Sequence, residues 1–156
     1  MAMAQAGEAS LVREIERQYR SGDRAAALTR LELAVLATPS SSALRFQLGV
    51  LSSESGRSRQ ATDIFEALVQ DHPELPEPYN NLAVLRAADG QLDQARALLE
   101  AALRADPAYA TAHLNLGDVL VRLALRAYQS AARPLSQDAA LNRRLQLAAE
   151  LVALPR

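Results

Sequence analysis

Apolar residues recur along the chain at helical spacing, and glycine and proline interrupt this pattern at regular intervals. In the first segment, Leu11, Ile15 and Tyr19 follow the i, i+4, i+8 spacing of one helix face. Gly22 ends that segment as a left-handed C-cap. The next segment ends before Pro39, because a residue that precedes proline avoids the α region. The pattern predicts two helices, at about 11–20 and 24–37, joined by a tight turn.

The same landmarks return with a period of 34 residues. Three columns share this period: Gly22, Gly56 and Gly90; Ala27, Ala61 and Ala95; Pro39, Pro73 and Pro107. Self-similarity at a fixed period is the mark of a repeat architecture. The sequence therefore predicts three helix–turn–helix repeats, at 8–41, 42–75 and 76–109.

A variant fourth repeat is predicted at 110–136. Ala124 stands where the turn glycine is expected, and no turn residue lies between Asp118 and Arg133. Two outcomes are open: a tight turn near 123–126, or a merger of both helices into one. We favour the merged helix, over about 111–133, which would be about 34 Å long at 1.5 Å per residue.

The two ends of the chain are predicted to lie outside the repeats. Residues 1–7 are expected to form a disordered leader. They are a cloning remnant, or the sequence that follows a removed signal peptide with an Ala-x-Ala site. Pro134 is expected to end the fourth repeat and Ser136 to N-cap a last helix, within 137–156, that caps the array.

The columns resemble the tetratricopeptide repeat (TPR), a helix–turn–helix unit of 34 residues. Its Leu-Gly position is matched at Leu48-Gly49, Leu82-Ala83 and Leu116-Gly117, and its Ala…Phe…Pro positions at Ala61, Phe65 and Pro73. The resemblance implies an all-α fold. It would be an α-solenoid of antiparallel helix pairs in a right-handed superhelix, with about 3.5 to 4 repeats and a C-terminal capping helix.

Two columns are expected to set the packing within each repeat. Gly49, Ala83 and Gly117 should let the second helix approach the first closely. Leu31, Phe65 and Leu99 should fill the space towards the next repeat. The substitution Gly49→Leu should overpack the site by about 1–3 kcal/mol.

Composition narrows the function classes. The formal net charge is −1, so nothing favours nucleic acid as a partner. There is no cysteine, and no apolar run is long enough for membrane insertion. Neither histidine sits in a metal-ligand pattern, and no phosphate-binding glycine loop is present. We expect no cofactor and no metal, and a protein that is not an enzyme, in the cytoplasm or periplasm. All 17 basic residues are arginine, which indicates a GC-rich bacterial genome.

The resemblance implies that the first helix of each repeat lines a concave, partner-binding surface. One column there holds Arg13, Gln47, Asn81 and Asn115. Side-chain amides donate and accept, so Gln47, Asn81 and Asn115 are predicted to form a ladder for the backbone of an extended peptide. The alternative is that they are solvated or bond within their own helix layer. The predicted partner-binding residues are Arg13, Phe46, Gln47, Val50, Asn80, Asn81, Val84, Leu114, Asn115 and Asp118.

The primary hypothesis is a scaffold or adaptor that holds an extended peptide or a partner protein. The alternative is a homo-oligomer within a larger assembly, such as one of the bacterial cell envelope. It would form through exposed leucines of the terminal helices: Leu123, Leu125, Leu147 and Leu154. A clamp for the acidic C-termini of chaperones is not expected. Such a clamp needs several cations, whereas the predicted surface carries Glu16, Glu54, Glu77 and Asp118.

Overall fold

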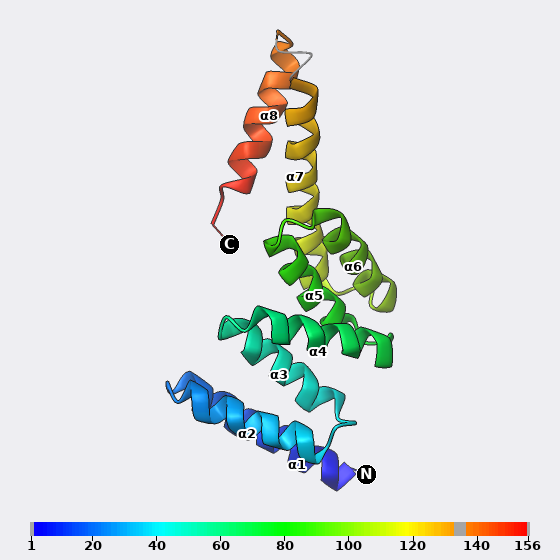
Figure 1. The fold of residues 1–156 in the computed structure, drawn as a ribbon. Coiled ribbons are helices and arrows are strands. Elements are labelled where there is room, and N and C mark those ends of the chain that lie inside the picture. The colour runs from blue at the N-terminus through cyan, green and yellow to red at the C-terminus, as the bar shows by residue number, and fades with distance from the viewer. Residues whose placement is uncertain (1, 133–136, 156) are drawn as a thin grey trace. The chain divides into compact units, whose positions relative to one another are not determined.

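The structure, a computed structural model, describes residues 2–132 and 137–155. These residues form eight α-helices and no strand (Figure 1). The helices are α1 (Ala2–Arg20), α2 (Arg24–Ala37), α3 (Ser42–Glu54), α4 (Ser58–Asp71), α5 (Pro76–Ala88), α6 (Leu92–Ala105), α7 (Ala110–Ala132) and α8 (Ala139–Val152). The fold is all-α, as predicted.

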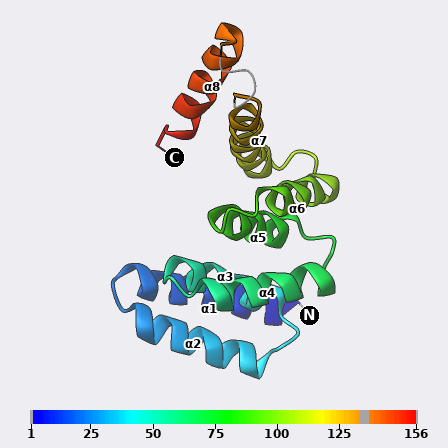
Figure 2. The ribbon, with the colours of Figure 1, turned by 45° about the horizontal axis from the view of Figure 1, so that its top comes forward.

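The chain divides into two compact units, 1–82 and 83–156, and α5 carries the boundary between them. In the first unit, α3 packs against α2 and α4, and α1 packs against α2 and α3. In the second unit, α7 packs against α6 on one side and α8 on another. Both views show α8 running back along α7 (Figure 2).

The tight turns after α1, α3 and α5 use the predicted glycines. Gly22, Gly56 and Gly90 have φ angles of 105°, 77° and 78°, in the left-handed region that favours glycine. After α3, the backbone N–H of Arg57 donates to the Ser52 carbonyl at 2.9 Å, and that of Gly56 donates to Ser53 at 3.0 Å. This pair of bonds is a Schellman cap, so the predicted glycine caps are confirmed.

The starts of α1 and α3 refine the predicted boundaries. α1 begins at Ala2 rather than near Leu11, so the segment expected to form a disordered leader continues the helix from residue 2. Of the three serines before α3, Ser41 is the N-cap, and its Oγ accepts a hydrogen bond from Leu44 N at 3.1 Å. The same hydroxyl donates to Glu8, which ties α1 to the start of α3.

The core of the first unit explains why glycine stands at position 49. Ala27, Ala61 and Phe65 are fully buried, as the repeat columns predicted. A Cβ atom added to Gly49 would lie 2.6 Å from Cε1 and 2.8 Å from Cζ of the Phe65 ring. The absence of a side chain at Gly49 therefore makes the space that the Phe65 ring occupies.

The fourth repeat is a merged helix, as favoured from the sequence. α7 continues without a turn from Ala110 to Ala132. The role predicted for Gly117 was wrong: this residue is exposed, and a Cβ added to it would meet nothing within 4 Å. The physical reason is the merger itself. Because α7 does not turn back near Ala124, no second helix of that repeat faces Gly117.

The last helix starts later than predicted and uses a different cap. Its N-cap is Asp138, whose carboxylate accepts a hydrogen bond from Leu141 N at 2.9 Å, so Ser136 is not the cap of this helix. Pro134 and Ser136 themselves lie outside the described residues. Leu141 and Ala148 are the buried residues of α8.

One ion pair joins α6 to α7 in the second unit. Arg126 Nη2 lies 2.7 Å from Asp93 Oδ2, and this hydrogen bond lowers the pKa of the Asp93 carboxyl below its ordinary value. A carboxyl with a depressed folded pKa contributes stability above its unfolded pKa and loses that stability as pH falls through the folded pKa. The pair is exposed, so this contribution is small.

We expect Arg126→Gln to raise the pKa of Asp93 towards the ordinary value, because the first cause of its depression is removed. A carbon-detected NMR titration of the side-chain carboxyls measures this. Glu14 is an internal control, since its pKa is lowered by Arg30 in the other unit. An Asp93 pKa that stays low in the variant would contradict the assignment.

Candidate peptide-binding surface

A hollow of about 160 Å³ lies between α1 and α3 in the first unit. Three of the predicted partner-binding residues line it: Phe46, Gln47 and Val50. They come from one face of α3, because residues three and four apart on a helix are neighbours. The hollow is completed by Leu51 and Glu54 of α3 and by Glu16, Tyr19 and Arg20 of α1.

Gln47 is the distinctive polar residue of this hollow. Its relative exposure is 9%, yet its side-chain amide makes no hydrogen bond to any residue that the structure describes. Among those residues, no side-chain nitrogen or oxygen is both fully buried and without a partner, so the amide of Gln47 keeps contact with solvent. A nearly buried amide with its donors and acceptor available is suited to bind a polar ligand group.

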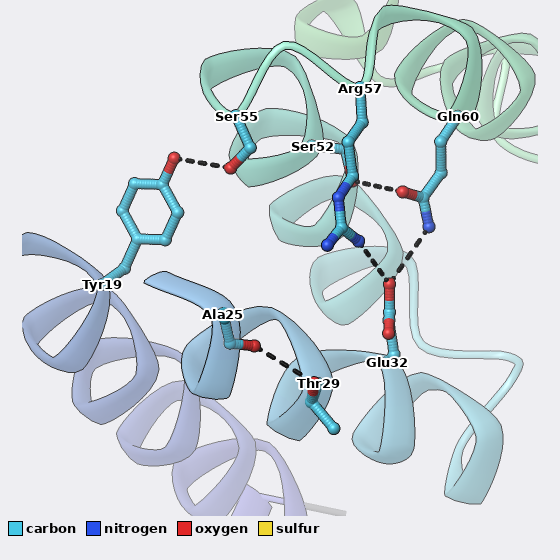
Figure 3. A network of polar contacts seen from close by, with 8 residues as sticks. All are labelled: Tyr19, Ala25, Thr29, Glu32, Ser52, Ser55, Arg57 and Gln60. Carbon is cyan, nitrogen blue, oxygen red and sulfur yellow. Dashed lines mark hydrogen bonds and ion pairs between the residues drawn. The ribbon is translucent and has the colours of Figure 1, made fainter. Parts of the chain in front are cut away.

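The aromatic walls of the hollow are held in place by contacts behind them. Phe46 packs against the buried ring of Phe65, with centroids 5.8 Å apart and planes tilted by 55°. The hydroxyls of Tyr19 and Ser55 share a hydrogen bond of 2.8 Å (Figure 3). The guanidinium of Arg24 lies 5.4 Å from the centre of the Tyr19 ring. Rigid walls lower the entropic cost of binding.

The α5 amides are less available than the sequence suggested. Asn81 Nδ2 donates to the Glu77 carbonyl one turn earlier, at 2.9 Å, so this side chain bonds within its own helix. Asn80 is buried and is also engaged in an interaction. Of the predicted ladder, Gln47 is therefore the member whose amide is available. Asn115 is engaged as well.

The remaining predicted residues lie in different surroundings. Arg13 is exposed on α1 and does not line the hollow between α1 and α3. Val84 is exposed, and it shares a very small hollow in the second unit with Asn115. Leu114 has a relative exposure of 68%.

A second hollow, of about 450 Å³, separates α7 from the C-terminal segment of the second unit. Leu114, Asn115 and Asp118 line its α7 side. The opposite side consists of C-terminal residues that sequence reasoning left out of the partner-binding surface: Leu151, Val152, Leu154 and Pro155. Their apolar character was visible in the sequence, but their return to the first half of α7 was not.

Another hollow in the first unit, of about 860 Å³, lies between α2 and α4. Two of its arginines already have partners. Arg45 pairs with Asp71 at 2.8 Å. Arg57 pairs with Glu32 at 3.0 Å, as Figure 3 shows. Gln60 Nε2 also donates to Glu32, at 3.3 Å. The contacts with Glu32 link consecutive repeats, and the Arg45–Asp71 pair joins α3 to α4 within one repeat. Arg45, Arg57 and Gln60 therefore have partners within the protein.

Comparison with known proteins assigns the fold. The family model of the TPR repeat matches residues 85–123. Among solved structures, TTC0263 of Thermus thermophilus, a thermophilic TPR protein, is 26% identical and has a TM-score of 0.66. The match covers 92% of this chain and 80% of that protein. The chain has the tetratricopeptide repeat fold.

Two further TPR structures show the same fold at lower identity. The first TPR domain of Spaghetti (RPAP3), bound to the HSP90 peptide SRMEEVD, is 17% identical with a TM-score of 0.67, over 74% of this chain and 91% of that one. MamA of Desulfovibrio magneticus RS-1 is 22% identical with a TM-score of 0.64, over 85% and 74%. The bacterial origin expected from the arginine-only composition is not confirmed by these relatives.

Two kinds of site are absent from the described residues, a metal cluster and a membrane-spanning helix. Within the described parts of the chain, no three His, Cys, Asp or Glu side chains gather as a metal site would require. No helix there is both long and apolar enough to cross a membrane. The hollow between α1 and α3 offers hydrogen-bonding and apolar groups.

Proposed function

We propose that this protein is a non-enzymatic interaction module that binds an extended segment of a partner protein, with the hollow between α1 and α3 as its main pocket. The observation that carries this proposal is Gln47, nine-tenths buried with an available amide beside the apolar surfaces of Phe46 and Val50. An extended peptide presents one backbone donor and one acceptor per residue, and a carboxamide complements both. The TPR fold supports the same function.

The peptide that this module binds should differ from the HSP90 peptide of the Spaghetti structure. That peptide, SRMEEVD, is acidic. Here the pocket rim carries Glu16 and Glu54, which would repel acidic side chains. We therefore propose a peptide without acidic residues at this pocket.

Self-association through the terminal helices receives less support. Leu147 and Leu154 are exposed, as that alternative requires. Leu123 and Leu125 are half-buried, and α7 packs against α8. Two of the four leucines expected to drive self-association are thus partly covered within one chain.

We expect Gln47→Ala to weaken peptide binding by about tenfold, the loss of one buried hydrogen-bonding group. The measurement starts from random linear peptides with capped ends, selected for binding to the full chain. Affinities of the selected peptides are then compared between variants. Stability should change little, because the Gln47 amide has no partner in the described part of the protein to lose.

Two controls locate the site. Asn81→Ala should have little effect, because that amide is already bonded to the Glu77 carbonyl. Leu33→Asp changes an exposed residue of α2 and should leave binding intact. Selected peptides that tolerate Gln47→Ala but not Leu33→Asp would place the binding surface on the other side of the repeats and overturn the proposal.

A further inference from the structure

The hollow between α1 and α3 combines an apolar floor with a carboxylate rim. Phe46, Val50 and Leu51 supply the apolar surface. Glu16 and Glu54 supply the carboxylates, and neither forms an ion pair or hydrogen bond with any described residue. Carboxylates that are not paired internally, next to buried apolar surface, are complementary to a long aliphatic side chain that ends in a cation.

Helix dipoles add to the negative potential at this place. Glu54 is the last residue of α3, and Glu16 lies just before the last turn of α1, which ends at Arg20. The C-terminus of a helix carries a partial negative charge, so an acidic residue there is disfavoured unless a cation is near. The hydrogen bond between Tyr19 and Ser55 shows that the two helix ends lie side by side (Figure 3).

One positive charge is already present at the hollow. Arg20 lines it, but its side chain is exposed and makes no ion pair within the described residues. Two carboxylates and two helix C-termini face this single guanidinium, so the balance stays negative. Arg20 should therefore weaken cation binding without preventing it.

The size of the hollow fits such a side chain. A volume of about 160 Å³ corresponds to roughly five water molecules at about 30 Å³ each. A lysine side chain has four methylene groups and one ammonium group. Its stem would lie on Phe46 and Val50, with its ammonium group between Glu16 and Glu54. The amide of Gln47 would then bond to the adjacent peptide group.

We infer that the hollow between α1 and α3 selects a basic residue, lysine or arginine, in the bound peptide; this inference rests on the proposed function. It assigns Glu16 and Glu54 as specificity-determining residues and Gln47 as the group that binds the peptide backbone. The aromatic ring of Phe46 would add a cation–π interaction with the bound basic side chain. The selectivity is opposite in sign to that of a site for acidic peptides.

The test uses short capped peptides of one neutral sequence that differ only in the central residue, which is Lys, norleucine or Glu. Norleucine keeps the aliphatic stem and lacks the ammonium group. Binding to the full chain is followed by chemical shifts of backbone amides in α1 and α3. We expect the Lys peptide to bind about five- to tenfold more tightly than norleucine at low salt, and the Glu peptide to bind most weakly. The preference should shrink at about 1 M salt.

Variants that remove a charge at the hollow test whether its negative charge causes the preference for lysine. Glu16→Gln with Glu54→Gln should abolish the preference for Lys over norleucine while leaving norleucine binding unchanged. Arg20→Gln should strengthen binding of the Lys peptide by about two- to threefold, because a competing cation is removed. An acidic-peptide site would respond in the opposite direction to both changes. Circular dichroism verifies that the variants are folded.

The outcomes separate this inference from the function on which it rests. If norleucine binds as well as Lys, the hollow is an apolar pocket, and the charge selectivity is wrong while the proposed function stands. If the Glu peptide binds best, the inference is overturned in the same way. If no peptide shifts the α1 and α3 amides and random libraries yield no binder, both fail.

Discussion

Gly49→Ala is expected to lower the free energy of unfolding by about 1–3 kcal/mol, and adding Phe65→Leu is expected to recover most of this loss. The added methyl group would lie 2.6 Å from the Phe65 ring, far inside van der Waals contact. The ring has no free direction of escape, because it is fully buried and packs against Phe46. Leucine at position 65 would leave the space that the methyl group needs.

The protein already contains the compensated pair one repeat later. Ala83 and Leu99 occupy the positions that correspond to Gly49 and Phe65, and both are almost fully buried. Phe65→Leu alone should cost on the order of 1 kcal/mol, because it leaves a cavity beside Gly49. The two changes should therefore couple favourably in a double-mutant cycle.

Urea unfolding of the parent chain, the two single variants and the double variant, followed by circular dichroism, measures this coupling. Hydrogen exchange of the α3 and α4 amides places the loss in the first unit. Gly117→Ala is the matched control: its Cβ meets nothing, so removing a helical glycine should stabilise the chain by about 0.5–1 kcal/mol. If Gly49→Ala costs the same with Phe or Leu at position 65, ring overlap is not the cause.

The regular part of this fold was predictable because each repeat uses the same local chemistry. A glycine at a tight turn and a proline after a helix are local constraints that any window of sequence reveals. The absence of a turn residue near Ala124 likewise predicted the merged α7 correctly. Gly117 shows the limit of this approach. Its column position was right, but its packing depended on a second helix that the merger removes.

The candidate site was predictable only in part. Periodicity put Phe46, Gln47 and Val50 on one helix face, and the structure brings them together in one hollow. Periodicity does not report hydrogen bonds, so it did not separate the available amide of Gln47 from that of Asn81, which donates to a carbonyl one turn earlier. It also contains no information on where a non-repeating segment returns in space, as Leu151 does beside α7.

Leu141→Asp is expected to undock α8 and unfold it. Leu141 and Ala148 are the buried residues of this helix, and Leu141 is the larger side chain of the two, so the packing of α8 on α7 depends strongly on it. Truncating a buried leucine costs about 2–5 kcal/mol, and burying a carboxylate in its place costs more. A free helix of 14 residues is marginal in water, so α8 should lose its helical structure once it is released.

The loss of helical structure in α8 should destabilise the C-terminal part of α7 more than its N-terminal part. α6 supports the part of α7 that includes Ala112, Val119 and the Asp93–Arg126 pair. Beyond Arg126, α7 depends more on α8, so its amides should exchange nearly as fast as those of an unfolded chain. Hydrogen exchange read by mass spectrometry resolves both segments of α7. The amides of the first unit should stay protected in the variant.

Leu147→Asp, an exposed position one residue before Ala148, is the matched control and should leave α8 protected. The two variants also distinguish a leucine that packs α8 within the chain from a leucine that contacts a second copy of the chain. If the protein self-associates through α8, light scattering should show a smaller species for Leu147→Asp, although its fold is intact. If Leu147→Asp unfolds α8 as Leu141→Asp does, the buried face has been assigned to the wrong side of the helix. A third outcome is a monomeric parent chain in which only Leu141→Asp unfolds α8. The buried face of α8 would then be used within the chain, and α8 would be a wall of the hollow beside α7 rather than an oligomer contact.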